Sequence, residues 1–168
     1  ARDPFGADAN DPVHRIGVPV GMFPTWLRCP RCGLLSDADV FEFQGSSRSP
    51  DSAAFVHRGC PKQKGRGRPP LCIPARFLVA CVAGHLDDFP WREFVHRGPT
   101  TCAGTLRFYE RGSSLETANL FVACDNGRGF GKGDDEESGG AGAGDGDCGS
   151  RPRSMVDAFG QRAVASLP

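Results

Sequence analysis

Four cysteines in the first half of the chain have the types and spacing of a metal site. Cys29-Pro-Arg-Cys32-Gly is a knuckle, a turn that aims two thiolates and several backbone N–H groups at one point. Cys60 and Cys72 follow and bring the number of thiolates to four, which closes a tetrahedral zinc site. Eleven residues separate these two, so they could instead be ordinary loop thiols, and His57 could replace either. The knuckle favours structural zinc over a disulfide framework.

A second set of cysteines predicts a second zinc site. Its members are Cys102, Cys124 and Cys148, and its fourth ligand is Cys81 or His85. Cys124 and Cys148 would reach knuckle spacing if the insertion between them were removed, so they resemble a knuckle with a loop spliced into its turn. Cys81 lies in an apolar run where a buried free thiol is common, and its role stays open. The cofactor that we expect is therefore Zn²⁺, as two ions.

A third constellation contains two histidines and two aspartates within twelve residues, namely His85, Asp87, Asp88 and His96. Such a set could form a hydrolytic metal site, so a metal-dependent nuclease using His85 and Asp87 is one alternative function. The structural interpretation is stronger, because the two aspartates suit the positive end of a helix and Trp91 suits a core. We therefore assign His85, Asp87, Asp88 and Trp91 to a structural junction or a partner surface, and expect no catalytic residue.

A basic loop lies between Cys60 and Cys72, in a stretch from Ala53 to Leu86 that contains no acidic residue. Its charges are Lys62, Lys64, Arg66 and Arg68. Such a run can follow a phosphate backbone, although a solvated surface loop without DNA contact is the alternative. Residues 134–147 hold six acids and no base among many glycines, which predicts disorder and a possible mimic of nucleic acid for the basic loop.

The composition limits the kinds of protein that the chain can be. It has 168 residues with a formal net charge of zero, so no global field draws it to nucleic acid or membrane. Only 39% of the residues are hydrophobic, and 23 glycines and 14 prolines favour turns, so the fold needs metal bonds as staples. No signal peptide and no apolar run of membrane length is visible, which predicts a cytoplasmic protein. The first residues read as a loop within a longer protein, and we expect a fragment.

These patterns predict an α+β fold, a small strand-rich zinc-binding domain with short helices and long loops. We expect extended segments at 40–43, 76–81, 105–110 and 120–124, of which the apolar segment 76–81 should be a buried strand. We also expect a short helix over 89–96 and a helix that begins at Ser154. The last two strands should be antiparallel neighbours. Three regions follow: an N-terminal loop segment over 1–25, a first zinc-knuckle region with the basic loop over 26–80, and a second cysteine-rich region over 81–168. The third region includes the acidic glycine-rich insertion (126–147) and the C-terminal helix.

One string resembles a known family. Gly84-His-Leu-Asp-Asp-Phe-Pro-Trp91, followed by His96, is similar to the B subunit of DISARM anti-phage systems, the DrmB family. The first knuckle and the cysteines at 102, 124 and 148 extend the resemblance over most of residues 16–162. It implies a zinc-binding, helicase-associated domain whose partner is an ATP-dependent helicase-like subunit, the pair engaging invading DNA. The insertion before Cys148 departs from the compact knuckle of relatives.

The sequence thus predicts a zinc-stabilised, non-catalytic module of an anti-phage defence complex. It would dock a helicase-like ATPase subunit and contribute to DNA binding, with no membrane partner and no small-molecule substrate. A pure protein-interaction scaffold without DNA contact is the first alternative, and the metal-dependent nuclease is the second.

Overall fold

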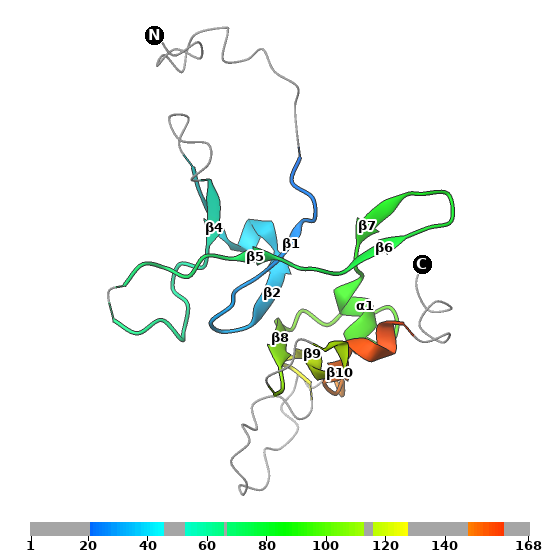
Figure 1. Ribbon diagram of the computed structural model, residues 1–168. Coiled ribbons are helices and arrows are strands. Elements are labelled where there is room, and N and C mark those ends of the chain that lie inside the picture. Colours follow the sequence, from blue (N-terminus) through cyan, green and yellow to red (C-terminus); the bar gives the residue numbers. More distant parts are fainter. Residues whose placement is uncertain (1–20, 46–52, 66, 113–115, 128–147, 160–168) are drawn as a thin grey trace, which may run out of the picture.

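A computed structural model describes residues 21–45, 53–65, 67–112, 116–127 and 148–159 (Figure 1). These residues form a six-stranded antiparallel sheet, two separate hairpins, a short α-helix and three 3₁₀ turns. The predicted strand-rich α+β class is confirmed. No helix in this described part is long and apolar enough to cross a membrane.

The sheet has the strand order β10-β9-β8-β2-β1-β5. Its strands are β1 (Trp26–Arg28), β2 (Leu34–Asp37), β5 (Ile73–Pro74), β8 (Leu106–Glu110), β9 (Leu120–Cys124) and β10 (Arg153–Ser154). The longest pairing joins β8 to β9, from Leu106 opposite Cys124 to Glu110 opposite Leu120, so the predicted antiparallel neighbours are confirmed. Strands from both sides of residue 80 share this sheet. The division into regions 26–80 and 81–168 stays a prediction.

Two hairpins lie beside the sheet. They pair β3 (Glu42–Gln44) with β4 (Ala54–Val56), and β6 (Leu78–Ala80) with β7 (Leu86–Asp88). The predicted buried strand over 76–81 is wrong in its burial, because β6 belongs to a hairpin that projects from the sheet (Figure 1). Leu78 is 39% exposed, and Cys81 beyond it is also exposed.

Adjacent side chains of β2 point to opposite faces of the sheet, as the pleat of a strand requires. Leu34 packs with Leu27 and Phe41 around Cys29, in a small core on one face. Leu35 packs into the larger core on the other face, with residues of α1 (Trp91–His96), β8 and β9. The short strand β2 therefore contributes to both cores.

Trp91 lies at the centre of the larger core, where it is 1% exposed. Its ring centroid is 4.8 Å from that of Phe89 and 6.0 Å from those of Phe77 and Phe108. Such tilted and edge-to-face pairs add to the free energy gained by burying their area. The predicted core position of Trp91 is confirmed.

The two aspartates before α1 have a different place from the one we expected. Asp87 and Asp88 lie in β7, and the helix begins after Pro90 without a side-chain cap. Asp88 Oδ2 instead accepts hydrogen bonds from the backbone N–H and the hydroxyl of Thr25, at 2.9 and 2.7 Å. Strand pairing with β6 outweighs the preference of a carboxylate for a helix N-terminus, which is worth only about 0.3–1 kcal/mol at a surface.

The 3₁₀ turns connect the strands. They are η2 (Ala38–Val40), η4 (Thr117–Asn119) and η5 (Met155–Ala158). Ser154 caps η5 by accepting a hydrogen bond from the backbone N–H of Val156 at 3.3 Å, so the predicted start is correct. Most of the expected C-terminal helix, like most of the N-terminal segment and of the acidic insertion, lies outside the described residues.

Substitution of Trp91 by alanine should lower the free energy of unfolding by about 3–5 kcal/mol, because it leaves a cavity in the larger core. Urea unfolding of the metal-loaded chain, followed by circular dichroism, measures this loss. Val82 is fully exposed, so Val82→Ala should change stability by no more than about 0.5 kcal/mol. Equal effects of the two substitutions would contradict the central place of Trp91.

Candidate metal centres

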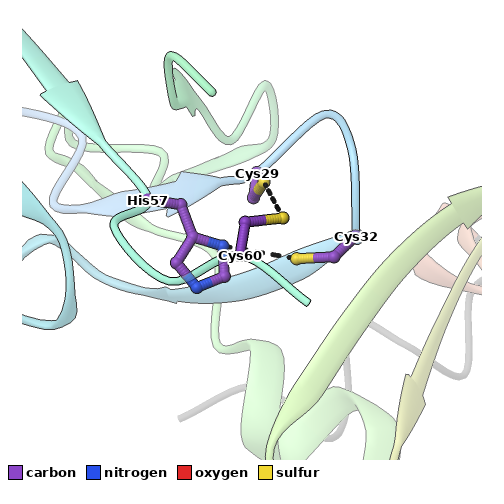
Figure 2. Close-up of side chains that lie close together, drawn as sticks. All are labelled: Cys29, Cys32, His57 and Cys60. Atoms are coloured by element: carbon purple, nitrogen blue, oxygen red, sulfur yellow. Dashed lines mark hydrogen bonds between the residues drawn. The ribbon is translucent and has the colours of Figure 1, made fainter. Parts of the chain in front are cut away.

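Four potential ligands meet beside the first knuckle, and we call them the first cluster: Cys29, Cys32, His57 and Cys60. Cys29 follows β1, Cys32 precedes β2, and the other two follow β4. Figure 2 shows their side chains pointing toward one another from these two hairpins. The cluster therefore joins the β1–β2 hairpin to the β3–β4 hairpin.

The spacing of the ligand atoms fits a tetrahedral ion. Cys29 Sγ lies 3.8 Å from Cys60 Sγ, and Cys32 Sγ lies 3.3 Å from His57 Nδ1. All four ligand atoms are within 4.8 Å of one another. A zinc–thiolate bond of about 2.3 Å gives a tetrahedron with a sulfur–sulfur edge of about 3.8 Å. The first cluster can therefore hold one metal ion without rearrangement of its backbone.

The knuckle turn is fixed by its backbone. The N–H of Cys29 donates to Leu34 O at 2.8 Å, and the N–H of Gly33 donates to Cys29 O at 2.9 Å. Gly33 has a φ of +74°, and a Cβ there would lie 2.5 Å from Phe108 O. Only glycine meets both demands. This close approach lets the N–H of Phe108 donate to Gly33 O at 2.7 Å, which ties the knuckle to β8.

The protonation of the first cluster suits metal binding. Burial raises the pKa of the Cys32 thiol to about 11. Burial, and then the positive charge of Arg107, lower the pKa of His57. Its imidazole is therefore neutral at pH 7 and has a lone pair for a cation. Because Cys32 is protonated in the metal-free chain, the binding of a metal must release a proton.

Cys72 lies next to the first cluster but outside the group of four. It packs against the same small core. Burial raises the pKa of its thiol to about 12, and the sulfurs of Cys29, Cys32 and Cys60 add to the shift. The sequence left His57 and Cys72 as alternative ligands of the first cluster, and the structure places His57 in the group of four. His57-Arg-Gly-Cys60 repeats the spacing of the knuckle, which was a signal for this pairing. A ligand role for Cys72 stays a prediction.

The second cluster is His96, Cys102, Cys124 and Cys148. These residues come from the end of α1, the segment before β8, the end of β9 and the segment before β10. Cys102 Sγ and Cys124 Sγ are 3.7 Å apart, again the edge of a zinc–thiolate tetrahedron. The structure thus brings together the three cysteines that the sequence grouped. Two metal ions could be held, one in each cluster.

His96 is the member of the second cluster that sequence reasoning missed as a ligand. Its Nδ1 lies 2.7 Å from Arg92 O, one turn back in α1, so an Nδ1–H donates to that carbonyl. Nε2 then carries the lone pair, and it is buried without a hydrogen-bond partner in the described part of the chain. A buried, unpaired Nε2 beside three sulfurs is what a metal-binding histidine presents, and the carbonyl fixes its tautomer.

Cys81 and His85 do not join the second cluster, although we expected one of them there. They face each other at the end of the β6–β7 hairpin, with Cys81 Sγ 3.3 Å from His85 Nδ1. Both side chains are exposed. The correction has a topological reason, because the hairpin projects away from β8 and β9 (Figure 1).

The thiols of the second cluster differ in acidity. Burial raises the pKa of Cys124 to about 12. Burial also acts on Cys148, but hydrogen bonds from the side chain and backbone of Ser150 outweigh it and lower the pKa to about 7. The Cys148 Sγ to Ser150 Oγ distance is 3.0 Å. Cys148 is therefore more readily ionised than Cys124 before any metal binds.

The basic loop begins at the first cluster. Lys62, Lys64 and Arg68 are exposed, and Arg66 lies outside the described residues. The N–H of His57 donates to Pro70 O at 3.0 Å, and the N–H of Cys72 donates to Phe55 O at 2.8 Å. Both ends of the loop are thus held against β4.

Two substitutions separate the candidate ligands of the first cluster. His57→Ala should weaken zinc binding at this cluster by about tenfold or more. Loss of a residue that only hydrogen-bonds to a ligand already costs about tenfold, and His57 is itself a candidate ligand. Cys72→Ser should keep two zinc ions per chain, because Cys72 lies outside the group of four. Competition with a chelating dye, with zinc counted by mass spectrometry, measures both. The reverse pattern would assign the position to Cys72.

Cys148 should be the fastest thiol of the second cluster to react with iodoacetamide in the metal-free chain, and Cys124 the slowest. The rate at Cys148 should fall as pH drops below about 7, because its thiolate takes up a proton. Ser150→Ala should move that midpoint to higher pH. Peptide mass spectrometry gives the rate at each site. A uniform rate over the thiols would contradict these differences.

Comparisons with known proteins support the resemblance to the DrmB family. A family model described as a domain of unknown function (DUF8724) matches residues 2–152. The DISARM protein DrmB of Bacillus paralicheniformis is 42% identical over 67 residues, and the match covers 37% of this chain and 12% of that protein. The match therefore spans a small part of the relative's length, and the resemblance to DrmB is confirmed over that part. Because the family model covers most of the chain, this protein belongs to the DUF8724 family.

Proposed function

We propose that the chain is a zinc-stabilised, non-catalytic module of a DISARM-type anti-phage defence complex. The observation that carries the proposal is the closure of both clusters. Each supplies four protein ligands, three sulfurs and one imidazole nitrogen, and this set is typical of structural zinc. Catalytic zinc sites keep a position open for water or substrate, and four protein ligands leave none.

The positions of the clusters support a structural role. The first cluster joins two hairpins, and the second joins the end of α1 to the end of β9 and to the segments before β8 and β10. Residues as far apart as Cys29 and Cys60, or His96 and Cys148, are thereby linked. Such cross-links suit a chain with little apolar area to bury. The metal would shape a surface rather than perform a reaction.

The name of the relative suggests which assembly the surface serves. DrmB is named as a DISARM protein. We propose that this chain likewise acts in antiviral defence, with a helicase-like ATPase subunit as its partner and in contact with DNA. These roles are proposed for the module, since the match covers 12% of the relative.

The basic loop is the surface that we assign to DNA. Lys62, Lys64 and Arg68 are exposed, and the loop is held at both ends beside the first cluster. Lysine and arginine side chains on a loop with fixed ends lose less freedom on binding a phosphate backbone than they would on a free tail. Arg58, just before the loop, is paired with Glu42 and is therefore not counted among the DNA-binding charges.

DNA binding by the chain should weaken steeply with salt, because each phosphate that is neutralised releases counterions. Lys62→Glu/Lys64→Glu should reduce affinity by tenfold or more at low salt and lower the slope of log Kd against log salt by about 2. Fluorescence anisotropy with labelled single- and double-stranded oligonucleotides measures both.

Arg76→Glu/Arg151→Glu is the matched control, since it reverses two exposed charges elsewhere with the same change in net charge. Its effect should be much smaller. If both pairs weaken binding equally, the loop is not the site. If the wild type does not bind DNA, the scaffold alternative gains, and co-purification with the helicase-like subunit then tests the remaining part of the proposal.

A further inference from the structure

Outside both clusters, a cysteine and a histidine converge at the end of the β6–β7 hairpin. Cys81 Sγ lies 3.3 Å from His85 Nδ1. The N–H of Cys81 donates to His85 O at 3.0 Å, and the N–H of Gly84 donates to Cys81 O at 2.9 Å. Gly84 has a φ of +86°, so the turn depends on glycine. The backbone thus holds Cys81 and His85 opposite each other, within reach of one ion.

The register of the hairpin places a carboxylate on the same face. Val79 is opposite Asp87, and Cys81 lies opposite His85 two residues further along. Side chains that alternate along a strand therefore put Cys81, His85 and Asp87 on one face. The three side chains are exposed, and the negative charge of Asp87 favours a cation there.

The surroundings of the Cys81 sulfur match those of the cysteines in the clusters. The backbone N–H of Ala83, two residues on, approaches it and stabilises its thiolate. The same relation joins Cys60 to Lys62, Cys124 to Asn126 and Cys148 to Ser150. Backbone donors two residues after a cysteine accompany its ligand role in both clusters, and Cys81 has them without being in either.

We propose that Cys81 and His85 form a third metal site, which binds zinc or a similar borderline-soft divalent cation through Sγ and Nδ1. Binding releases the thiol proton to solvent, and the thiolate and the imidazole lone pair each form one bond to the ion. The site is open-sided, so water fills its remaining positions in the isolated chain. Val82 and Leu86 beside it are exposed, 110% and 60%, which suits a second protein surface that supplies the remaining ligands. The inference does not rest on the proposed function.

A cobalt titration tests the proposal on the chain with its two clusters already loaded with zinc. Co²⁺ bound to a thiolate gives a charge-transfer absorption in the near ultraviolet. The wild type should take up one additional cobalt ion with this band while it keeps two zinc ions. Cys81→Ser should abolish the band, and His85→Ala should weaken binding by about tenfold or more. Val82→Ser, which alters the same turn and keeps both ligands, should behave as wild type.

Alkylation gives a second readout that does not depend on cobalt. Added Zn²⁺ should slow the labelling of Cys81 by iodoacetamide in the wild type, and His85→Ala should remove that protection. The proposal is overturned if the wild type takes up no third ion, or if Cys81→Ser and His85→Ala bind it as the wild type does. The retained count of two zinc ions shows separately whether the clusters, and with them the proposed function, hold.

Discussion

The structure depends on the convergence of buried sulfur and nitrogen atoms at two points. In each cluster two sulfurs lie 3.7–3.8 Å apart, too far for a disulfide and close enough to share one ion. Burial raises the pKa of Cys32 to about 11 and that of Cys124 to about 12, so without a cation these thiols stay protonated in an apolar setting. A divalent ion bound there would replace those protons and form four bonds, and its binding would then be coupled to folding.

Strand β8 connects the two clusters structurally. Arg107 donates to Cys32 O at 3.2 Å, and Phe108 donates its N–H to Gly33 O, so the first knuckle is fastened to this strand. β8 pairs with β9, which ends at Cys124 of the second cluster. The larger core, with Trp91 at its centre, covers one face of the sheet between the two clusters. Disruption of either cluster would thus loosen the strand on which the other cluster depends.

Short-range patterns in the sequence were enough to predict some elements of this structure. The first knuckle was readable because two cysteines and a glycine at fixed spacing specify a turn by themselves. Strand β8 could be predicted because its apolar positions alternate, and β9 could be predicted because it is a short continuous apolar run. His96 was missed as a ligand of the second cluster, although Cys102 follows six residues later, because its spacing grouped it with His85 and the two aspartates. The exposure of β6 could not be inferred, since an apolar run looks the same whether a sheet covers it or not.

The insertion between Cys124 and Cys148 shows why ligand spacing can fail as a guide while geometry holds. The N–H of Gly127 donates to Cys124 O at 2.9 Å, and the N–H of Cys148 donates to Asn126 O at 3.0 Å. A Cβ at Gly127 would lie 2.4 Å from Ser150 Oγ, so the two flanks are in close contact. The residues on either side of 128–147 thus form one knuckle-like turn. Closing a longer loop costs little extra, about 0.6 kcal/mol per doubling of length. What the site requires is contact between the flanks, and this contact is present here although residues 128–147 separate them in the sequence.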